Sequence, residues 1–458
     1  MSILFKNAKI LIRENGYKVI DGFLGVKDEY IDYIGTETPK TAYDHMKDMG
    51  GKLLMPGLVN IHGHSAMTLV RGAGSGLPLD RWLNEAIFPV EANMKPEDII
   101  AGDKLAIMEM IAGGTTQVAD MYDFPFAGAY AYADTGMKVN LCRVGLCFDP
   151  SLEPGSWPRT AECINFINIV RGDADINGEL LREIPEAEAQ GGLPDFVKEA
   201  VKAGRIIPDF CLHSEYLTTE KFVRAIEEAN RTMKARVHVH ISETKKEHEE
   251  CIARHGRTPV KYLADMGILD NPTYAAHCVW VTDEDMEIMK AKDFTLAHNP
   301  TSNLKLGSGV ARISKALEMG INVGLGTDGV ASNNNLDMWE EMHLAALLQK
   351  GINHDPTLVS DAQVIDMATI NGAKALGRPD TGELAVGKKA DIIALDFDKP
   401  HLTPAFDIPA LLVYSAQASD VCMTMVDGKV LYENGEFKTI DADKAYYEIK
   451  RAADRLKG

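Results

Sequence analysis

The segment LLMPGLVNIHGHSAMTLVRG, residues 53–72, decides the predicted fold, because two histidines follow directly on a continuous apolar run. A short apolar run beside proline and glycine is typical of a strand that is buried on both faces. Residues i and i+2 of a strand point to the same face, so His62 and His64 can point the same way. The segment therefore predicts a buried strand that delivers two imidazoles to one place.

The middle of the chain, residues 58–385, repeats this pattern of a short apolar strand and a longer amphipathic helix. Strand-like pieces such as TTQVADM, RVHVHIS and INVGLGTD each follow a helical or turn segment. About eight such units predict an α/β protein with a (β/α)8 TIM-like barrel rather than an open sheet. Residues 180–194 break the alternation, and we expect an irregular insertion or a surface helix there.

Both ends of the chain are rich in β-prone residues broken by Asn, Gly and Asp. Residues 1–57 are predicted to form the N-terminal part of a small β-sandwich module. Residues 386–458 are predicted to add its C-terminal part and a C-terminal helix. Within the latter, the Asp427-Gly428 pair between apolar stretches is a hairpin signal.

Composition and charge exclude several classes of function. A chain of 458 residues can bury a large core and a smaller module. Its formal net charge of -19 repels phosphate backbones, so nucleic acid is not an expected partner. No apolar run approaches the length of a membrane span, and the N-terminus lacks the apolar core of a signal peptide. Seven cysteines without a C-x-x-C pair predict reduced thiols and a cytoplasmic protein.

Polar side chains stand at or just after the ends of the predicted strands, where a parallel barrel places its catalytic groups. Besides His62 and His64, they are His213, His238, His240, Glu243, His277 and Asp328. Three histidines and a carboxylate from separate strand ends suit a divalent ion such as Zn²⁺. Such an ion lowers the pKa of a bound water toward about 7, and a nearby carboxylate can take the water's proton. The pattern predicts a metal-dependent hydrolytic site.

Simpler interpretations exist for each residue alone. A single histidine at a strand end is usually a hydrogen-bonded structural residue. An aspartate in that position is usually a helix N-cap. The alternation of the strand does not choose between His238 and His240, because both point to the same face.

Five motifs, in this order along the chain, resemble the amidohydrolase superfamily. They are PGLVNIHGHSAMTLVRG, HVHISET, AAHCVWVTDED, AHNPTSNLKLGSG and VGLGTDGVASNNNLDMWEEM. Within the superfamily they are similar to the S-adenosylhomocysteine/5′-methylthioadenosine deaminases and to related triazine and chlorohydrolase enzymes. The resemblance extends over nearly the whole chain, including the split β module.

This resemblance implies a barrel with one divalent metal, most often zinc and in some members iron. The implied ligands are His62, His64, His240 and Asp328, which leaves His238 as a structural residue one layer deeper. No lysine stands at the strand end where a second metal would need it.

The resemblance also implies hydrolytic deamination of an adenosine-type nucleoside, with release of ammonia and the inosine derivative. Glu243 resembles the proton shuttle, and Asp328 accepts a further proton from the water. His277 resembles the residue that orients the attacking water, and His213 the one that hydrogen-bonds a purine ring nitrogen.

Three further residues resemble positions that bind the substrate. Trp82 would pack against the base, or else belongs to the core. Glu91 would accept the ribose hydroxyls, or else lies on a surface helix. Arg143 would bind the carboxylate of S-adenosylhomocysteine, or else forms a structural ion pair.

One departure from the family pattern puts the substrate in question. Where the family has His-Ala-Pro-Tyr, this chain has His213 followed by Ser, Glu215 and Tyr, which we expect to bring a new carboxylate near the pocket. Arg159 is a weak candidate for a second carboxylate-binding arginine. The alternative function is therefore deamination or dechlorination of another N-heterocycle, such as guanine, cytosine, a pterin or an s-triazine. A remote alternative is a non-catalytic barrel scaffold, and relatives suggest a homo-oligomer.

Overall fold

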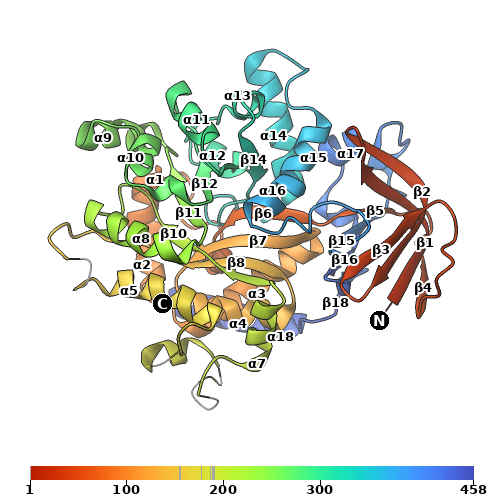
Figure 1. Cartoon of the computed structure of the whole chain (residues 1–458), viewed down its shortest axis with the longest axis horizontal. Coiled ribbons are helices and arrows are strands. Elements are labelled where there is room, and N and C mark those ends of the chain that lie inside the picture. The colour runs from red at the N-terminus through yellow and green to blue at the C-terminus, as the bar shows by residue number, and fades with distance from the viewer. Residues whose placement is uncertain (1, 154–155, 177, 186, 188–190, 458) are drawn as a thin grey trace.

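The computed structural model of the chain describes residues 2–153, 156–176, 178–185, 187 and 191–457. Figure 1 shows a large mixed α/β body with a β-rich module at one end, where the strands from both ends of the chain lie together. Among the described residues, no helix is long and apolar enough to cross a membrane.

The module is one nine-stranded sheet that joins the two ends of the chain. Its strands run in the order β18-β17-β16-β15-β5-β1-β2-β3, with β4 paired to β1. From the N-terminal end come β1 (Ser2–Arg13), β2 (Tyr17–Lys27), β3 (Tyr30–Gly35), β4 (His45–Asp48) and β5 (Leu53–Pro56). From the C-terminal end come β15 (Ile392–Leu395), β16 (Val421–Val426), β17 (Lys429–Glu433) and β18 (Glu436–Phe437). The sandwich form of the module and its boundaries stay predictions.

The Asp427-Gly428 hairpin has the predicted form. Strands β16 and β17 pair antiparallel, with Val426 opposite Lys429. Both turn residues have positive φ, +46° for Asp427 and +73° for Gly428, as a two-residue turn between twisted strands requires.

The body holds two parallel sheets, built from the strands that the alternating pattern predicted. One contains β6 (Leu58–Gly63), β7 (Thr115–Tyr122), β8 (Lys138–Arg143) and β9 (Ile206–Pro208). The other contains β10 (Phe210–Leu212), β11 (Val237–Ile241), β12 (Thr273–His277), β13 (Phe294–His298) and β14 (Asn322–Leu325). Nearly all of their residues are buried, because helices cover the outer faces.

The edges of the two sheets lie beside each other. On one side only Asp209 separates β9 from β10, and its N–H donates to the carbonyl of Leu141 at 2.8 Å. On the other side, the Asp328 N–H after β14 donates to the carbonyl of His62 in β6 at 2.9 Å. The carboxyl ends of strands from both sheets therefore meet at one end of the body.

Helices alternate with these strands along the chain. The longer ones are α3 (Pro96–Ala112), α4 (Pro125–Thr135), α5 (Pro158–Arg171), α7 (Asp195–Lys202), α8 (Glu220–Met233), α9 (Lys245–His255), α11 (Asp283–Lys290), α14 (Met338–Asn353) and α15 (Asp361–Ala368). Shorter ones are α1 (Leu79–Arg81), α2 (Phe88–Glu91), α10 (Pro259–Asp265), α12 (Pro300–Lys305), α13 (Ile313–Glu318), α16 (Ile370–Ala375) and α17 (Ile408–Tyr414). In the segment 180–194, a 3-10 helix ends at Glu183, while residues 186 and 188–190 lie outside the described residues.

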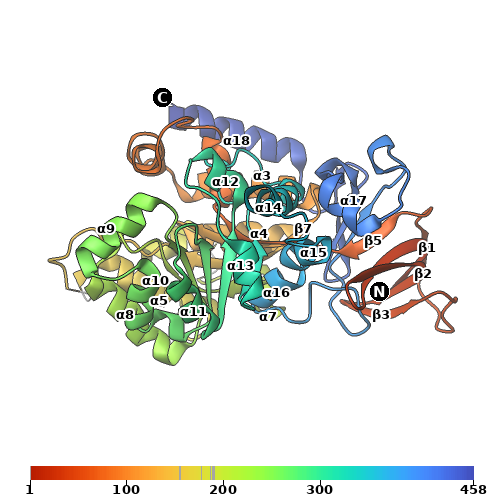
Figure 2. The same cartoon turned by 90° about the horizontal axis from the view of Figure 1, so that it is seen from above.

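The C-terminal helix α18 (Ala442–Lys457) leaves the module and packs along α3 of the body, as Figure 2 shows. Arg455 near its end forms an ion pair with the buried carboxylate of Asp98. The last residues of the chain thus hold the module and the body together.

A buried ion cluster joins the first residue of β8 to the module. The Lys138 ammonium lies 2.7 Å from a carboxylate oxygen of Asp391 and 2.7 Å from one of Asp427. All three side chains are less than a tenth exposed. Burial raises the pKa of Asp391, and Lys138 opposes that shift by stabilising the ionised form.

We expect Lys138→Met to lower the free energy of unfolding by about 3–5 kcal/mol, because the buried Asp391 loses its cation and Asp427 keeps only Lys389, 3.7 Å away. Urea denaturation followed by circular dichroism measures the change. The control is Lys198→Met, which removes an exposed pair with Asp195 and is expected to cost less than about 1 kcal/mol. Equal effects of the two substitutions would show that the buried cluster contributes no more than a surface pair.

Candidate metal centre and active-site pocket

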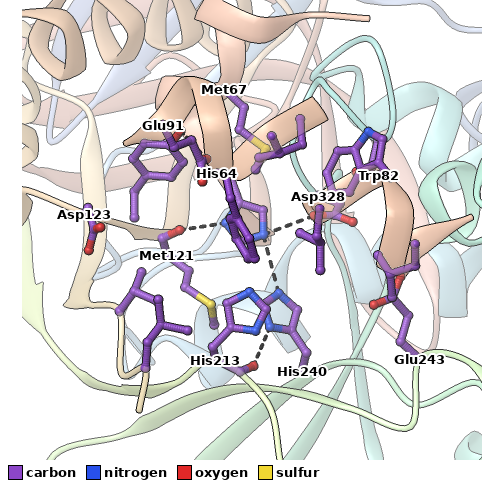
Figure 3. Close-up of a pocket in the computed structure, with 18 of the residues that line it drawn as sticks. His64, Met67, Trp82, Glu91, Met121, Asp123, His213, His240, Glu243 and Asp328 are labelled. Atoms are coloured by element: carbon purple, nitrogen blue, oxygen red, sulfur yellow. Dashed lines mark hydrogen bonds and ion pairs between the residues drawn. The ribbon is translucent and has the colours of Figure 1, made fainter. Parts of the chain in front are cut away.

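His64, His240 and Asp328 line a pocket at the strand ends (Figure 3), and the buried His62 lies directly beside them. The Nε2 atoms of His62 and His64 lie 3.3 and 3.2 Å from the same oxygen, Oδ1 of Asp328. The Nε2 atom of His240 lies 3.4 Å from that of His64. Two overlapping sets of atoms, each within 4.8 Å of one another, could hold a metal ion: those of His62, His64 and His240, and those of His62, His277 and Asp328. His62 and His64 thus point to one place, as the opening segment predicted.

The other nitrogen of each imidazole is already held. His64 Nδ1–H donates to the Met121 carbonyl at 2.6 Å, and His240 Nδ1–H donates to the His213 carbonyl at 2.5 Å. Such bonds fix the tautomer and leave the Nε2 lone pair free for a metal. The Nε2 atom of His62 is buried and has no hydrogen-bond partner. The donor set therefore fits a divalent metal ion.

His238 takes a different position from His240. Its Nε2 atom lies 2.8 Å from Nδ1 of His62, and its ring packs on Tyr274, with the centroids 4.4 Å apart. It is buried below the cluster and is absent from the groups of atoms that could hold a metal. The structure thereby separates the two histidines that strand alternation left equivalent.

Electrostatics within the cluster favour an ionised Asp328. Burial opposes its ionisation, but His62 and His64 overcome this and hold the pKa of Asp328 well below its usual value. Burial lowers the pKa of His62 to about 4. It also acts against His64, but Asp328 and the Met121 carbonyl raise the pKa of His64 to about 9.

Glu243 and His277 line the same pocket, and His277 also lies beside His62 and Asp328. A carboxylate oxygen of Glu243 is 3.7 Å from His277 Nε2, and Nδ1 of His277 is 2.8 Å from Oδ1 of Asn303. Burial raises the pKa of Glu243. Its backbone is held as well, since the Glu243 N–H donates to Glu247 at 2.7 Å. A buried carboxylate with a raised pKa, next to a histidine, is a candidate for general acid–base chemistry.

The backbone at the strand ends is unusual where it carries these side chains. His277 and Asp328 have φ of +73° and +62°, a region that residues other than glycine rarely adopt. His277 is the last residue of β12 and Asp328 comes three residues after β14, so the left-handed backbone occurs where the chain enters the pocket, and such strain concentrates at functional sites.

Of the predicted substrate residues, Trp82, Glu91 and His213 line the pocket. Trp82 is 5% exposed, and its indole N–H donates to the Ala73 carbonyl at 3.0 Å. Glu91 accepts a hydrogen bond from the Tyr122 hydroxyl at 2.6 Å, and burial raises its pKa. Glu91, the last residue of helix α2, is thus half-buried and turned toward the pocket that it lines.

Arg143 does not line the pocket among the described residues. Its Nε and Nη2 atoms donate to one oxygen of Glu162 at 3.0 and 2.8 Å. The structure thus has the ion pair that was the alternative to a substrate contact. Arg159 is likewise bound to a protein carboxylate, that of Asp123.

The expectation that Glu215 adds a carboxylate to the pocket is wrong. Its oxygens are 2.6 Å from Arg254 Nη2 and 2.8 Å from His255 Nε2, both at the end of α9. The side chain is 2% exposed and does not line the pocket. Glu215 therefore anchors the end of α9. The nearby residues His213 and Tyr216, and not Glu215, line the pocket.

Sequence reasoning missed Tyr122, Asp123 and Asn303, which contact the predicted residues or line the pocket. Tyr122 and Asp123 directly end a buried strand, β7, as His277 ends β12. The same strand-end rule could have found them. Asn303 lies within a quoted motif but on a helix, where no rule singles out one amide.

Comparisons with known proteins agree with this geometry. The family model described as "Amidohydrolase family" matches residues 53–431. The chain is 42% identical to a 5-methylthioadenosine/S-adenosylhomocysteine deaminase of Acetivibrio thermocellus, over 100% of both proteins. It is 41% identical to a 5′-deoxyadenosine deaminase of Methanosarcina acetivorans, over 99% of this chain and 98% of that protein. A solved adenosine deaminase from Xanthomonas campestris with bound zinc superposes with a TM-score of 0.86 at 27% identity, covering 99% and 98% of the two chains.

We expect Glu215→Gln to lower the free energy of unfolding by about 1–3 kcal/mol, because a buried charge-assisted pair is lost. Turnover of any substrate is expected to stay unchanged, since the side chain faces away from the pocket. Thermal denaturation and steady-state kinetics measure the two effects. Glu220→Gln, which removes an exposed pair with Arg224, is the control. A loss of turnover with unchanged stability would restore Glu215 to the pocket.

Proposed function

This chain belongs to the amidohydrolase family and is a hydrolase of carbon–nitrogen bonds, and on that premise we propose that it deaminates adenosine-type nucleosides. The substrates would be 5′-methylthioadenosine, 5′-deoxyadenosine, S-adenosylhomocysteine or adenosine, and the products ammonia and the inosine derivative. One observation carries the proposal: His64, His240 and Asp328 of the candidate metal site line the same pocket as the half-buried carboxylate of Glu91. The first group suits deamination chemistry, and the second suits a ribose.

The fold that positions these groups is, in our proposal, a closed (β/α)8 barrel. Strands β9 and β10, separated by a single residue, count as one strand, so the two parallel sheets supply the required number. The hydrogen bond from Asp328 N–H to the His62 carbonyl supports closure between β14 and β6. Closure would bring the strand ends with His62, His240, His277 and Asp328 around one mouth.

We assign the metal site to His62, His64, His240 and Asp328, with Zn²⁺ as the first choice and Fe²⁺ as the second. A set of imidazole nitrogens with one carboxylate oxygen is characteristic of catalytic zinc. When bound, the ion would supply a water made acidic enough to act as a nucleophile at neutral pH.

The chain's own groups would then position the substrate and move protons. Glu243 would take a proton from the attacking water and deliver it to the purine ring nitrogen beside the reacting carbon. Asp328 would accept a further proton. His277, oriented by Asn303, would hold the water and stabilise the developing charge.

Three lining residues would hold the nucleoside. His213 would hydrogen-bond a ring nitrogen of the purine. Trp82 would pack against the base, with its indole fixed by the Ala73 carbonyl. Glu91 would accept the two ribose hydroxyls, and Tyr122 already orients its carboxylate.

A second candidate is deamination of another N-heterocycle, such as guanine, a pterin or an s-triazine. The ion pair of Arg143 with Glu162 favours it, because the expected contact to the substrate's carboxylate is taken by the protein. The half-buried Glu91 favours the nucleoside, because a free base offers it no diol. Whether the chain forms homo-oligomers stays a prediction.

The metal site can be tested by exchanging two neighbouring histidines. We expect His240→Asn to abolish stoichiometric metal binding, because a direct ligand is lost. His238→Asn is the matched control, since it removes only a partner of His62 and is expected to weaken metal affinity by about 10–100-fold. Elemental analysis and competition with a chelator measure both. Loss of metal in the His238 variant alone would reverse the assignment.

Ammonia release tests the function itself. We expect zinc-loaded protein to act on 5′-methylthioadenosine, 5′-deoxyadenosine and adenosine, and not on adenine, guanine, cytosine, a pterin or an amino-triazine. Turnover of a free base or a triazine, without turnover of any nucleoside, would replace the leading function by the second candidate.

Glu243→Gln tests the proton shuttle. We expect turnover to fall by about 10²–10⁴-fold while the metal content stays the same, because the amide cannot exchange the proton. Glu249→Gln, on the exposed surface of α9, is the control. A Glu243 variant with undiminished turnover would contradict the assigned role.

A further inference from the structure

The carboxylate of Glu243, the assigned proton shuttle, makes long contacts with its neighbours. Its Oε1 atom lies 3.5 Å from the hydroxyl of Ser308, and its Oε2 atom lies 3.7 Å from Nε2 of His277. Contacts longer than the usual O–H···O distance of about 2.5–3.0 Å restrain a side chain weakly. They also leave the oxygens able to take up and release a proton. The position of Glu243 therefore has to come from its backbone.

That backbone belongs to a tight turn directly after β11. Ser242 has a φ of +49°, which residues other than glycine rarely adopt. The Ile241 carbonyl accepts a hydrogen bond from the Cys278 N–H at 3.0 Å. The Ser242 carbonyl accepts one from the Trp280 N–H, also at 3.0 Å. The loop after β12 thus holds the carbonyl groups of the turn, and its N–H groups need another partner.

The side chain of Glu247 is that partner. One of its oxygens accepts the Ser242 N–H at 2.9 Å, and the other accepts the Glu243 N–H at 2.7 Å. Glu247 is 5% exposed and is the third residue of α9, after the N-cap Thr244. A glutamate in this position commonly bonds back to the N–H of the N-cap residue. Here it reaches past the cap and bridges both N–H groups of the turn that carries the shuttle.

This bridge requires two acceptor oxygens on Glu247. Burial and the nearby Glu243 raise the pKa of Glu247 to about 8, and the N–H donors oppose that shift because they stabilise the ionised form. Each oxygen accepts a separate N–H, as the oxygens of an ionised carboxyl do. A glutamine at this position keeps one acceptor, and a methionine keeps none.

We propose that Glu247 is a positioning residue of the reaction, which holds the backbone of Glu243 so that its carboxylate meets the attacking water and the purine ring nitrogen. The described lining of the pocket does not include Glu247, so it acts through Glu243 and not on the substrate. Misplacing a reacting group by about 1 Å costs roughly 100-fold in rate. Loss of the bridge therefore lowers turnover and leaves binding intact. The inference rests on the proposed function, because it takes Glu243 as the proton shuttle.

The test compares Glu247→Met, which removes both acceptors, with Glu247→Gln, which keeps one. We expect kcat for 5′-methylthioadenosine to fall about 10–100-fold in the methionine variant and less in the glutamine variant. KM and metal content are expected to stay within about twofold of the wild type, because no group that binds substrate or metal changes. Glu249→Met, at an exposed position of α9, is the matched control and is expected to keep the wild-type kcat.

Hydrogen exchange of the metal-free protein gives a readout that does not depend on turnover. In Glu247→Met, we expect the peptide that contains Ser242 and Glu243 to exchange at least about tenfold faster, because both N–H groups lose their acceptor. The rest of α9 is expected to exchange as in the wild type. Unchanged exchange in the turn would overturn the proposal.

A second background separates positioning from general support of the fold. In Glu243→Gln, we expect Glu247→Met to lower the residual turnover by less than about threefold, because the group that it positions no longer transfers a proton. Equal losses in both backgrounds would overturn the proposal, as would a wild-type kcat in Glu247→Met alone. If Glu247→Met does not fold, Glu247→Gln carries the same comparison.

Failure of the proposed function would show separately. The wild type would then release no ammonia from any nucleoside, while hydrogen exchange of the turn would still report whether Glu247 holds it.

Discussion

The geometry of the site depends on a buried convergence of imidazoles on one carboxylate. His64 and His240 each donate a hydrogen bond from Nδ1 to a backbone carbonyl. The Nε2 atom of each ring therefore points to the space beside Asp328. Polar atoms buried without partners cost free energy, and a bound cation offsets that cost. The strands that carry these side chains must therefore end at the same level, so that the ligand atoms meet. Glu243, two residues after β11, and His277, the last residue of β12, lie 3.7 Å apart beside this cluster.

Much of this arrangement follows from periodicity and from the rule that parallel strands end together. The spacing of His62 and His64 predicts a shared direction, and the structure brings both to Asp328. Alternation does not separate His238 from His240, because both point to the same face of β11. The distinction comes from depth along β11, where His238 meets Tyr274 and His62 instead of the cluster.

The ion pairs could not be predicted, because their partners come from elements whose packing the sequence does not show. Arg143 was expected to face a substrate and Glu215 to enter the pocket. Glu162, which binds Arg143, lies on the next helix, 19 residues on, and Arg254, which binds Glu215, lies 39 residues on. A charge in a strand or loop indicates that a partner exists, and only the packed structure says which one. The net charge of the chain likewise does not predict the local charge of the pocket lining.

The pairing of β5 with β15 has a consequence for how the chain is made. Strand β5 is complete at Pro56, but the strand that covers its edge begins only at Ile392. At ribosomal rates that interval lasts on the order of tens of seconds, during which β5 carries unpaired backbone groups. For most of its synthesis, the nascent chain therefore exposes a strand edge whose unpaired N–H and C=O groups can pair with another chain. The edge of β5 is covered only when β15, one of the strands made late in synthesis, has left the ribosome.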